Sequence, residues 1–416
     1  MAQSPIRVDT NIVGMKRSFS QNGDDDAEPS ATADERESLG IPGLPAFLNL
    51  TMPAIGRKFQ DLEWQERMRI MEGELANDPK HRWAIESDPE IKARNRYANI
   101  QAWANSRIHL KVPDGQCDFI NASPITLKDS KTGEETRYIA TQGPRDGIHL
   151  THFWQMVFDE TKEIAVIVML TRTVEGGREK CAQYYPVDMD NPTVELPAPL
   201  RRPSQEGESS EETPAESPGK VQLLEYEFDN DCRSEVRKLE LTIGSESKTV
   251  WHYMFAGWPD FSRPEGDDRK ALIELLHVTA SKSTLDNPRI IHCSAGVGRT
   301  GTFIALDHLL RELDSGELLK DRESDPDDDP VFNTVNTLRE QRVHMVYNEM
   351  QLQFVYEVLR EQSMLKLGIS YDHLPAELRS PKVARLSDDD YVPASKPELE
   401  AIVSPIQSDA SDEESE

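Results

Sequence analysis

Residues 292–301 read HCSAGVGRTG, the strongest local signal in the chain. A short apolar run before it predicts a buried strand (288–296), and the amphipathic segment 301–313 after it predicts a helix. A loop of small residues in this place can turn successive backbone N–H groups inward, and the helix N-terminus adds a positive dipole. Glycines permit the backbone angles that such a loop needs. The stretch therefore predicts an anion-binding loop, formed by Ser294, Ala295, Gly296, Val297 and Gly298.

Two side chains give this loop its chemistry. Arg299 ends the loop with a planar guanidinium group, which can hold two phosphate oxygens at once. Cys293 begins the loop, where the same N–H groups and the helix dipole would stabilise a thiolate and make the sulfur a nucleophile toward phosphorus. A buried cysteine is most often an inert apolar residue, but the flanking His292, the glycines and Arg299 favour a catalytic role here.

The other cysteines, Cys117, Cys181 and Cys232, keep the structural interpretation. They form no CxxC pair and no tight metal-ligand spacing, which disfavours both a disulfide scaffold and a zinc site. Free thiols in a reducing compartment fit this pattern best.

A second motif, AGWPDF, spans residues 256–261 and follows a predicted strand. Phosphoryl transfer away from a basic oxygen needs a proton donor at the leaving group, and Asp260 could supply it. A loop that carries the donor can also close over the site and exclude water, with Trp258 and Pro259 as hinge and brace. A Pro-Asp pair is also ordinary turn chemistry, so this motif identifies a site only in the company of the first.

Strands and helices alternate along the rest of the chain. The continuous apolar run IAVIVML (164–170) is typical of a buried strand. Further strands are predicted at 221–228, 236–243 and 248–256, and further helices at 57–72, 333–343 and 349–362. This alternation within one domain indicates an α/β or α+β fold with a sheet flanked by helices.

The net charge of −28 is concentrated in four segments rich in Ser, Pro, Asp and Glu. Such segments bury too little apolar surface to offset the entropy lost on ordering. We therefore expect disordered tails at 1–40 and 366–416, and acidic loop inserts at 195–219 and 321–330, around one catalytic domain at 41–365. Simple solvation explains acidic runs, and their Ser-Pro pairs and acid-flanked serines leave phosphorylation open as a second role.

The charge also excludes some classes of function. Non-specific binding to nucleic acid needs a cationic face, which this composition does not supply, although a small basic pocket stays possible. The first residues contain no signal-peptide core, and no run of about 18 apolar residues predicts a membrane span. We expect a soluble protein of the cytoplasm, with the nucleus left open.

The stretch HCSAGVGRTG resembles the signature loop of the cysteine-based protein tyrosine phosphatases, HCxxGxxR followed by Ser or Thr. The resemblance implies a single domain with a highly twisted mixed sheet flanked by helices, and a two-step reaction through a cysteinyl phosphate without metal or cofactor. Thr300 would donate a hydrogen bond to the sulfur of Cys293 and help it leave in the second step. AGWPDF resembles the mobile loop that carries the general acid, which implies that Asp260 is this acid and that Phe261 lines the substrate pocket.

Further motifs occur in the order typical of the family. ARNRYANI (93–100) resembles the loop whose tyrosine stacks on the phosphotyrosine ring, so Tyr97 would set a depth that phosphoserine cannot span. Asn99 stands where many members carry an Asp that orients the peptide backbone. Glu175 and Lys180 match the loop whose Glu positions the catalytic Arg and whose Lys contacts the acid loop. The other matching segments are CDFINAS (117–123), YIATQGP (138–144), FWQMV (153–157) and KCAQYYP (180–186).

One motif departs from the family pattern QTxxQ. VYNEMQ (346–351) places Tyr347 where the first Gln helps to position the hydrolytic water, and Gln351 occupies the second position. Two interpretations follow: either Gln351 holds the water alone, with Asp260 as the base, or hydrolysis of the phosphocysteine is slower. A third interpretation makes Tyr347 a packing residue on a shifted helix.

Together these motifs favour a non-receptor phosphatase specific for phosphotyrosine in proteins, with a mitogen-activated protein kinase as the substrate suggested by family analogy and a monomer as the family default. A phosphotyrosine-binding protein without activity is an alternative that Tyr347 alone supports, and the intact Cys293, Arg299 and Asp260 oppose it. A dual-specificity or lipid phosphatase is a second alternative, which the Tyr97 loop and the Trp-Pro-Asp sequence disfavour.

Overall fold

The computed structural model describes residues 38–113, 115–198, 218–320 and 328–370. Most of the predicted tails and of the two acidic inserts lie outside these ranges, so their predicted disorder stays a prediction. Within the described ranges, no helix has both the length and the apolar character that crossing a membrane requires.

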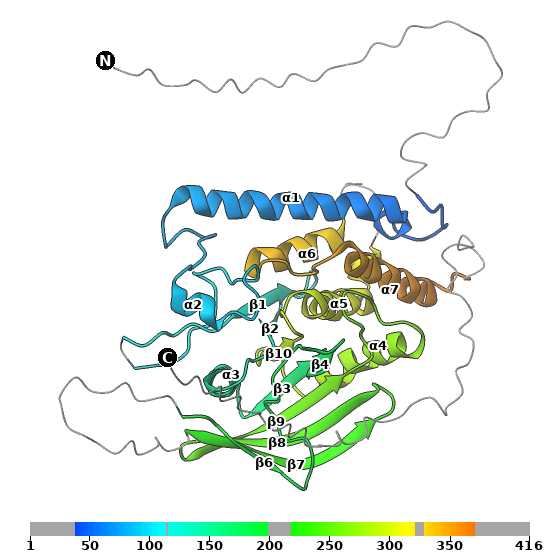
Figure 1. Cartoon of the computed structure of the whole chain (residues 1–416). Helices are drawn as coiled ribbons and strands as arrows, with labels where there is room; N and C mark the ends of the chain where they lie inside the picture. Colours follow the sequence, from blue (N-terminus) through cyan, green and yellow to red (C-terminus); the bar gives the residue numbers. More distant parts are fainter. Residues whose placement is uncertain (1–37, 114, 199–217, 321–327, 371–416) are drawn as a thin grey trace, which may run out of the picture.

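A mixed eight-stranded sheet runs through the described domain in the order β1-β2-β10-β3-β9-β8-β7-β6 (Figure 1). Its central strands β2, β10, β3 and β9 are parallel, and the neighbours on both sides are antiparallel. The bounds are β1 Ala122–Lys128, β2 Glu135–Thr141, β3 Ile164–Met169, β6 Thr193–Glu195, β7 Gly219–Asp229, β8 Ser234–Ile243, β9 Glu246–Phe255 and β10 Arg289–His292. A separate hairpin consists of β4 Val174–Glu175 and β5 Arg178–Glu179.

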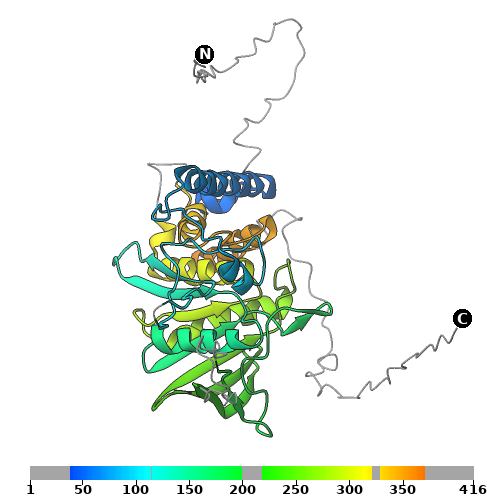
Figure 2. The same cartoon turned by 60° about the vertical axis from the view of Figure 1, so that its left-hand side comes forward.

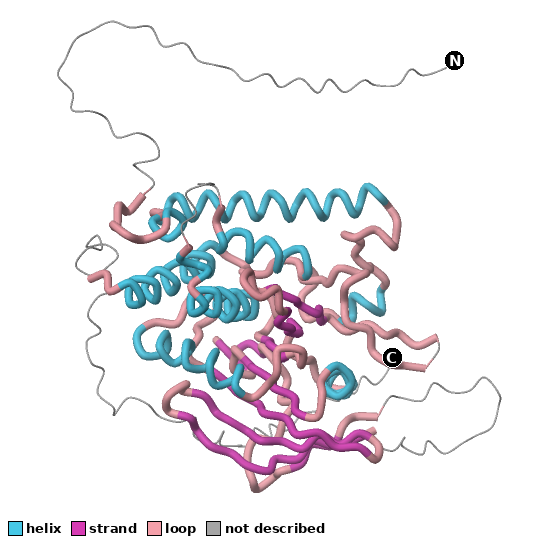
Figure 3. The backbone as a smooth tube through the Cα atoms, turned by 180° about the vertical axis from the view of Figure 1, so that it is seen from behind, coloured by secondary structure: helices cyan, strands magenta, loops and turns pink. Residues whose placement is uncertain are grey.

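Helices cover both faces of this sheet. They are α1 Met52–Ala76, α2 Pro89–Arg94, α3 Ile148–Glu160, α4 Gly266–Ser281, α5 Gly298–Ser315, α6 Pro330–Gln341 and α7 Glu349–Leu367, with short 3-10 turns at Ala46–Asn49 and Glu317–Leu319. Helix α5 packs against α6 and α7, and α1 packs across α6 and α7. In Figures 1 and 2, α1 lies on the side of this helical layer that faces away from the sheet, and Figure 3 shows the layer and the sheet from behind.

The central strand β3 shows how the sequence builds two cores. Its run IAVIVM is rich in β-branched residues, which suit a strand buried on both faces. Val166 and Val168 belong to the core beneath α1, α4, α5, α6 and α7. Ala165, Ile167 and Met169 point to the opposite face and join the core around α3. The strand therefore alternates between two apolar layers, and β10 beside it is buried in the same way.

Local sequence signals fix the helices that frame the site. Asp329 caps the N-terminus of helix α6, and its side chain accepts hydrogen bonds from the N–H groups of Val331 and Phe332. Pro330 occupies the first turn of the helix. Asn348 caps the N-terminus of helix α7, and its side chain accepts a hydrogen bond from the N–H of Gln351. Gly368, in the left-handed region, caps the C-terminus of the same helix. The cap at Asn348 places Gln351 in the first turn of α7.

The predicted strands and helices are confirmed, with shifted bounds. Helix α6 begins at Pro330, inside the predicted insert 321–330, because Asp329 caps it. The insert 195–219 is bounded by residues of β6 and β7. Helix α7 runs to Leu367, so the C-terminal tail cannot begin at 366. Ser38 forms a β-bridge with Leu50, so the last residues of the predicted N-terminal tail belong to the domain.

Candidate active site

The loop between β10 and α5 carries Cys293, at the carboxyl end of the central strand β10, and Arg299 lies in the first turn of α5. The Cys293 side chain is 5 % exposed, and its Sγ accepts a hydrogen bond from the N–H of Gly296 at 3.3 Å. Helix α5 begins at Gly298, so its N-terminal dipole acts on the same sulfur. The predicted turn of backbone N–H groups toward the anion position is therefore formed at Gly296.

Two glycines in this loop are required by their surroundings. Gly296 has φ +72°, and a Cβ there would lie 2.1 Å from the backbone oxygen of Thr141. A Cβ on Gly298 would lie 2.9 Å from Nε2 of Gln351. The first glycine allows the turn, and the second allows the α7 amide to approach the loop.

Arg342 holds the loop from behind, and sequence reasoning missed it. Its Nε donates to the carbonyl oxygen of Gly296 at 2.9 Å, and its NH2 donates to that of Ala295 at 3.2 Å and to Oδ1 of Asn121 at 2.7 Å. Burial lowers the pKa of Arg342 to about 10, so the guanidinium stays charged at pH 7. These bonds fix the carbonyls of Ala295 and Gly296, next to the Gly296 N–H that donates to the Cys293 sulfur.

Arg299 is fixed by Glu175 in a bidentate ion pair. Its NH1 donates to Oε1 of Glu175 at 2.8 Å and its NH2 to Oε2 at 2.6 Å, and NH1 also donates to the carbonyl of Leu170 at 2.9 Å. Burial alone would raise the pKa of Glu175, but its hydrogen bonds to Arg299 outweigh burial and lower it. Burial likewise opposes the charge of Arg299, and Glu175 outweighs it and raises the pKa of the guanidinium. The predicted positioning role of Glu175 thus has its contact.

The loop 256–261, the predicted acid loop, contacts Arg299 at the end of the loop 293–298, the predicted phosphate-binding loop. Oδ1 of Asp260 is 2.9 Å from NH2 of Arg299, and its other oxygen pairs with Nζ of Lys180. Trp258 is buried, and its Nε1 donates to the carbonyl of Ser262 at 2.9 Å, which closes the turn around Pro259. The contact between Lys180 and the acid loop is the one expected from the sequence.

One cavity of about 300 Å³ brings most of the predicted residues together. It is lined by Tyr97, Asn99, Ile100, Arg178, Glu179, Lys180, Asp260, Phe261, Cys293, Ser294, Ala295, Val297, Gly298, Arg299, Tyr347 and Gln351. The hydroxyl of Tyr97 lies 2.8 Å from Oγ of Ser294, which joins the cavity wall to the loop. Phe261 is 63 % exposed at the rim. Six of the predicted site residues do not line the cavity: Gly296, Thr300, His292, Trp258, Pro259 and Glu175.

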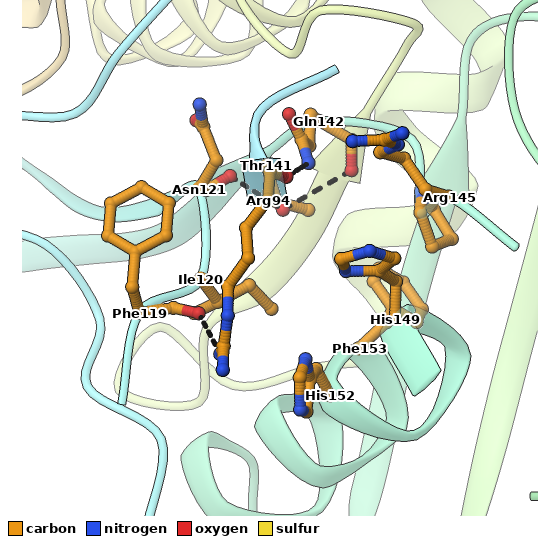
Figure 4. Close-up of a pocket in the computed structure, with 11 residues that line it drawn as sticks. Arg94, Phe119, Ile120, Asn121, Thr141, Gln142, Arg145, His149, His152 and Phe153 are labelled. Carbon is orange, nitrogen blue, oxygen red and sulfur yellow. Dashed lines mark hydrogen bonds between the residues drawn. The ribbon is translucent and has the colours of Figure 1, made fainter. Parts of the chain in front are cut away.

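The segment that carries Tyr97 is held from its far side by Gln142. The amide of Gln142 donates to the carbonyl of Arg94 at 2.8 Å and accepts from the N–H of Arg96, also at 2.8 Å. Figure 4 shows the first of these bonds beside a small crevice that His149 and His152 of α3 also line. Gln142 belongs to YIATQGP, so the motif was recognised from the sequence but this contact was not.

The comparisons with known proteins agree with this geometry. The family model for protein-tyrosine phosphatase matches residues 91–361. The chain belongs to the protein tyrosine phosphatase family. It is a hydrolase that removes phosphate from tyrosine, and the relatives below include members of the non-receptor type.

Three curated relatives illustrate the similarity. Tyrosine-protein phosphatase 2 of Schizosaccharomyces pombe is 34 % identical over 327 residues, which cover 78 % of this chain but only 41 % of that protein. Tyrosine-protein phosphatase 1 of Saccharomyces cerevisiae is 34 % identical, over 75 % of this chain and 95 % of its own length. Human tyrosine-protein phosphatase non-receptor type 2 is 28 % identical, over 79 % of this chain and 74 % of its own length.

A solved structure shows the same fold. The catalytic domain of human protein tyrosine phosphatase non-receptor type 18 superposes with a TM-score of 0.56 at 24 % identity, over 74 % of this chain and 96 % of that domain. The predicted fold, a mixed sheet flanked by helices, is confirmed by this likeness and by the sheet order above.

In this phosphatase the residue before Cys293 belongs to a buried network. Nδ1 of His292 lies 3.1 Å from the carbonyl of Cys293, and because a carbonyl only accepts, Nδ1 carries the proton. Nε2 of His292 is then free to accept from the hydroxyl of Tyr184 at 2.6 Å. Burial lowers the pKa of His292 to about 4, so the ring is neutral at pH 7. Tyr184 lies in KCAQYYP, and only the motif itself pointed to it.

The last predicted residues of the phosphatase lie at the start of α7. The N–H of Tyr347 donates to Oε1 of Gln351 at 3.0 Å, and the Gln351 amide lines the cavity beside Gly298. Thr300 is buried, and its hydroxyl has no hydrogen-bond partner among the described residues, so its predicted donation to the Cys293 sulfur is not formed in this state. Within the described residues, no three His, Cys, Asp or Glu side chains group as a metal site.

Proposed function

We propose that this phosphatase acts on phosphotyrosine in proteins with Cys293 as the nucleophile, Arg299 as the phosphate-binding cation and Asp260 as general acid and then base. The single observation that carries the proposal is that these three residues line one cavity, on three different elements, with Asp260 2.9 Å from Arg299. The inward N–H groups of the loop and the Arg299 guanidinium supply the charge stabilisation that phosphoryl transfer needs.

In the first step, the Cys293 sulfur forms a bond to phosphorus as the bond from phosphorus to the tyrosine oxygen breaks. Asp260 gives its proton to that oxygen, so tyrosine leaves as a neutral phenol. Arg299 is shared between Glu175 and Asp260, and a phosphate group that binds its guanidinium competes with Asp260 for NH2. This competition frees the Asp260 carboxyl for the leaving oxygen.

In the second step, water attacks the phosphocysteine, Asp260 takes the proton, and the sulfur leaves as a thiolate. Gln351 positions the water through its side-chain amide, which the N–H of Tyr347 holds in place. Thr300 donates to the leaving sulfur once its hydroxyl turns toward it. Its lack of any other hydrogen-bond partner among the described residues supports this role.

Specificity for phosphotyrosine comes from the cavity walls. Tyr97 and Phe261 come from two different motifs and both line the cavity. Their aromatic rings favour the binding of a planar phenyl group. Asn99 is exposed at the mouth, where its amide can hold the peptide backbone. Cys293 is almost fully buried, so a short phosphoserine or phosphothreonine does not reach it.

We extend the proposal to partners and place. The substrates are phosphotyrosine-containing proteins, with a mitogen-activated protein kinase as the first candidate, and the enzyme acts as a monomer. The related phosphatase non-receptor type 18 has been solved with phosphopeptides of HER2. The proposed compartment is the cytoplasm, with the nucleus as the alternative, and the likeness to a phosphatase named as non-receptor type supports it.

The experiment is a comparison of matched peptides that carry phosphotyrosine, phosphothreonine or phosphoserine at one position. The proposal expects turnover of the phosphotyrosine peptide at least about 100-fold above the other two. It also expects Tyr97→Ala to lower that preference, since the wall that sets the depth is lost. Comparable turnover of all three peptides would contradict the proposal and favour a dual-specificity enzyme.

A further inference from the structure

Tyr347 replaces the residue usual in the family, and the mechanism above gives its side chain no role. The ring lies at the rim of the cavity and is 37 % exposed. Its centroid is 6.4 Å from that of Phe261, on the acid loop, and 6.0 Å from that of His344, edge to face. Both distances lie in the range of favourable aromatic pairs. Tyr347 therefore connects the acid loop to the segment before α7.

That segment is anchored to helix α1. Glu66 is buried and accepts from the backbone N–H of His344 at 2.6 Å, and its other oxygen lies 2.8 Å from Nδ1 of the same histidine. Arg339 pairs with Glu66 at 3.4 Å. Burial alone would raise the pKa of Glu66, but His344 and Arg339 outweigh burial and lower it, so the carboxylate stays charged. The edge of His344 that faces Tyr347 is thus held in place.

The next two residues are held equally firmly. Arg339 donates from Nε to the carbonyl of Met345 and from NH2 to that of Val346, each at 3.0 Å. The N–H of Val346 donates to the carbonyl of Val297 in the phosphate-binding loop at 3.1 Å. Tyr347 consequently projects from a backbone that is fixed relative to the phosphate-binding loop.

Phe261 also needs support from outside the acid loop. Its φ of +55° lies in the left-handed region, which is unfavourable for a residue with a side chain. Three contacts with other elements hold it: the ring of Tyr347, Nζ of Lys180 at 6.0 Å, and a long hydrogen bond of 3.4 Å from Nδ2 of Asn348 to its carbonyl. Phe261 directly follows Asp260, so these contacts act on the acid.

We infer that Tyr347 is a positioning residue of the acid loop: its ring, braced by His344, holds Phe261 and so keeps Asp260 over the Cys293 loop. The inference rests on the proposed role of Asp260 as general acid. It assigns Tyr347 to the step that protonates the leaving group. The water-positioning role of the usual Gln then falls to Gln351 alone.

The test uses two substrates that differ in how much they need an acid. Phosphotyrosine and phenyl phosphate release a basic phenolate, so their leaving oxygen needs a proton. Para-nitrophenyl phosphate releases a stable phenolate, so its leaving oxygen does not need one. The kinetic constant kcat/KM covers the chemistry up to formation of the phosphocysteine, so it excludes the water step. The variants are Tyr347→Ala, Tyr347→Gln, Tyr347→Phe and Asp260→Asn, each checked for folding by thermal unfolding.

An acid contributes roughly 100- to 10,000-fold, and a loosened loop should forfeit part of that. For Tyr347→Ala and Tyr347→Gln we expect kcat/KM on phenyl phosphate to fall about 10- to 100-fold and on para-nitrophenyl phosphate less than about 3-fold. Tyr347→Phe keeps the ring and should stay near wild type on both. In an Asp260→Asn background, Tyr347→Ala should add no further difference between the substrates, because the two residues act through one step.

Each other outcome overturns the inference. Equal losses on both substrates would make Tyr347 only structural. A loss of kcat with unchanged kcat/KM would place it in the water step. If Asp260→Asn treats the two substrates differently and Tyr347→Ala does not, the inference fails and the proposed function stands. If Asp260→Asn itself shows no difference, the acid assignment fails first.

Discussion

The substitution Glu175→Gln tests how far Arg299 depends on one buried partner. Oε1 of Glu175 accepts from Arg299 NH1, from the hydroxyl of Thr171 at 3.0 Å and from the N–H of Arg172 at 3.2 Å. These three donors require an oxygen at that position, so a glutamine would place its carbonyl there. Its NH₂ group would then replace Oε2 and face NH2 of Arg299, donor against donor, where the 2.6 Å bond now lies.

The loss is therefore about one charge-assisted hydrogen bond, together with the carboxylate charge. Such a bond contributes about 1.5–3 kcal/mol, which corresponds to about 10- to 100-fold in rate or binding. Arg299 is almost fully buried, so water does not replace the lost acceptor. We expect kcat/KM on a phosphotyrosine peptide to fall by that factor, and the inhibition constant of inorganic phosphate to rise, since both depend on the orientation of the guanidinium.

The matched control is Glu86→Gln. Glu86 makes a second bidentate pair with a buried arginine, Arg107, at 2.6 and 3.3 Å, and it does not line the cavity. Both variants should lose comparable thermal stability, but only Glu175→Gln should lose activity. If Glu175→Gln keeps kcat/KM and phosphate inhibition within about 3-fold of wild type, the positioning of Arg299 by Glu175 is wrong.

Three further predictions follow from single positions. Gly296→Ala should abolish turnover, because the new Cβ would meet a backbone oxygen at 2.1 Å. The control Gly147→Ala has a similar φ of +73° but no atom within 4 Å of the new Cβ, so it should only lower the melting temperature. Equal activities of the two variants would refute this prediction. Burial alone would raise the pKa of Asp307, but its two arginine partners outweigh burial and lower the pKa from 3.8 to about 2. The charged carboxylate therefore stabilises the folded state above pH 4, and this stabilisation is lost as the pH falls toward 2. Urea unfolding of Asp307→Asn should show about 3–5 kcal/mol less stability at pH 7 and a flatter acid limb, and an unchanged limb would contradict the assignment. Peroxide should inactivate the enzyme at Cys293 and dithiothreitol should restore it, and inactivation that labels another cysteine first would count against a reactive thiolate.

The sequence predicted the parts of the site that are local in the chain. The phosphate-binding loop depends on small residues between one strand and one helix, and those are visible within ten residues. The buried strand β3 was visible for the same reason, because an uninterrupted apolar run needs no partner to be recognised. Resemblance to a family supplied Tyr97, Glu175 and Lys180, and each now has a contact that explains its place.

The remaining features depend on contacts between distant segments. Arg342 reads as one more charged residue at the end of a helix, and only the fold brings its guanidinium to the carbonyls of the loop. Tyr184 meets His292 across 108 positions, and Glu66 meets His344 across 278. Helix α4, by contrast, was missed although its buried residues Ala271, Leu272, Leu275 and Leu276 recur at helical spacing. The strand order likewise follows from pairings that no local pattern encodes.

The most direct test of the account is hydrolysis of para-nitrophenyl phosphate by wild type and Cys293→Ser, with EDTA present and with folding verified. The account predicts steady turnover by wild type and none by the variant. A wild-type burst of about one equivalent that then stops would place the nucleophile correctly and contradict a competent water step. Turnover that survives in Cys293→Ser, or that EDTA abolishes in wild type, would contradict the central claim that Cys293 carries the reaction.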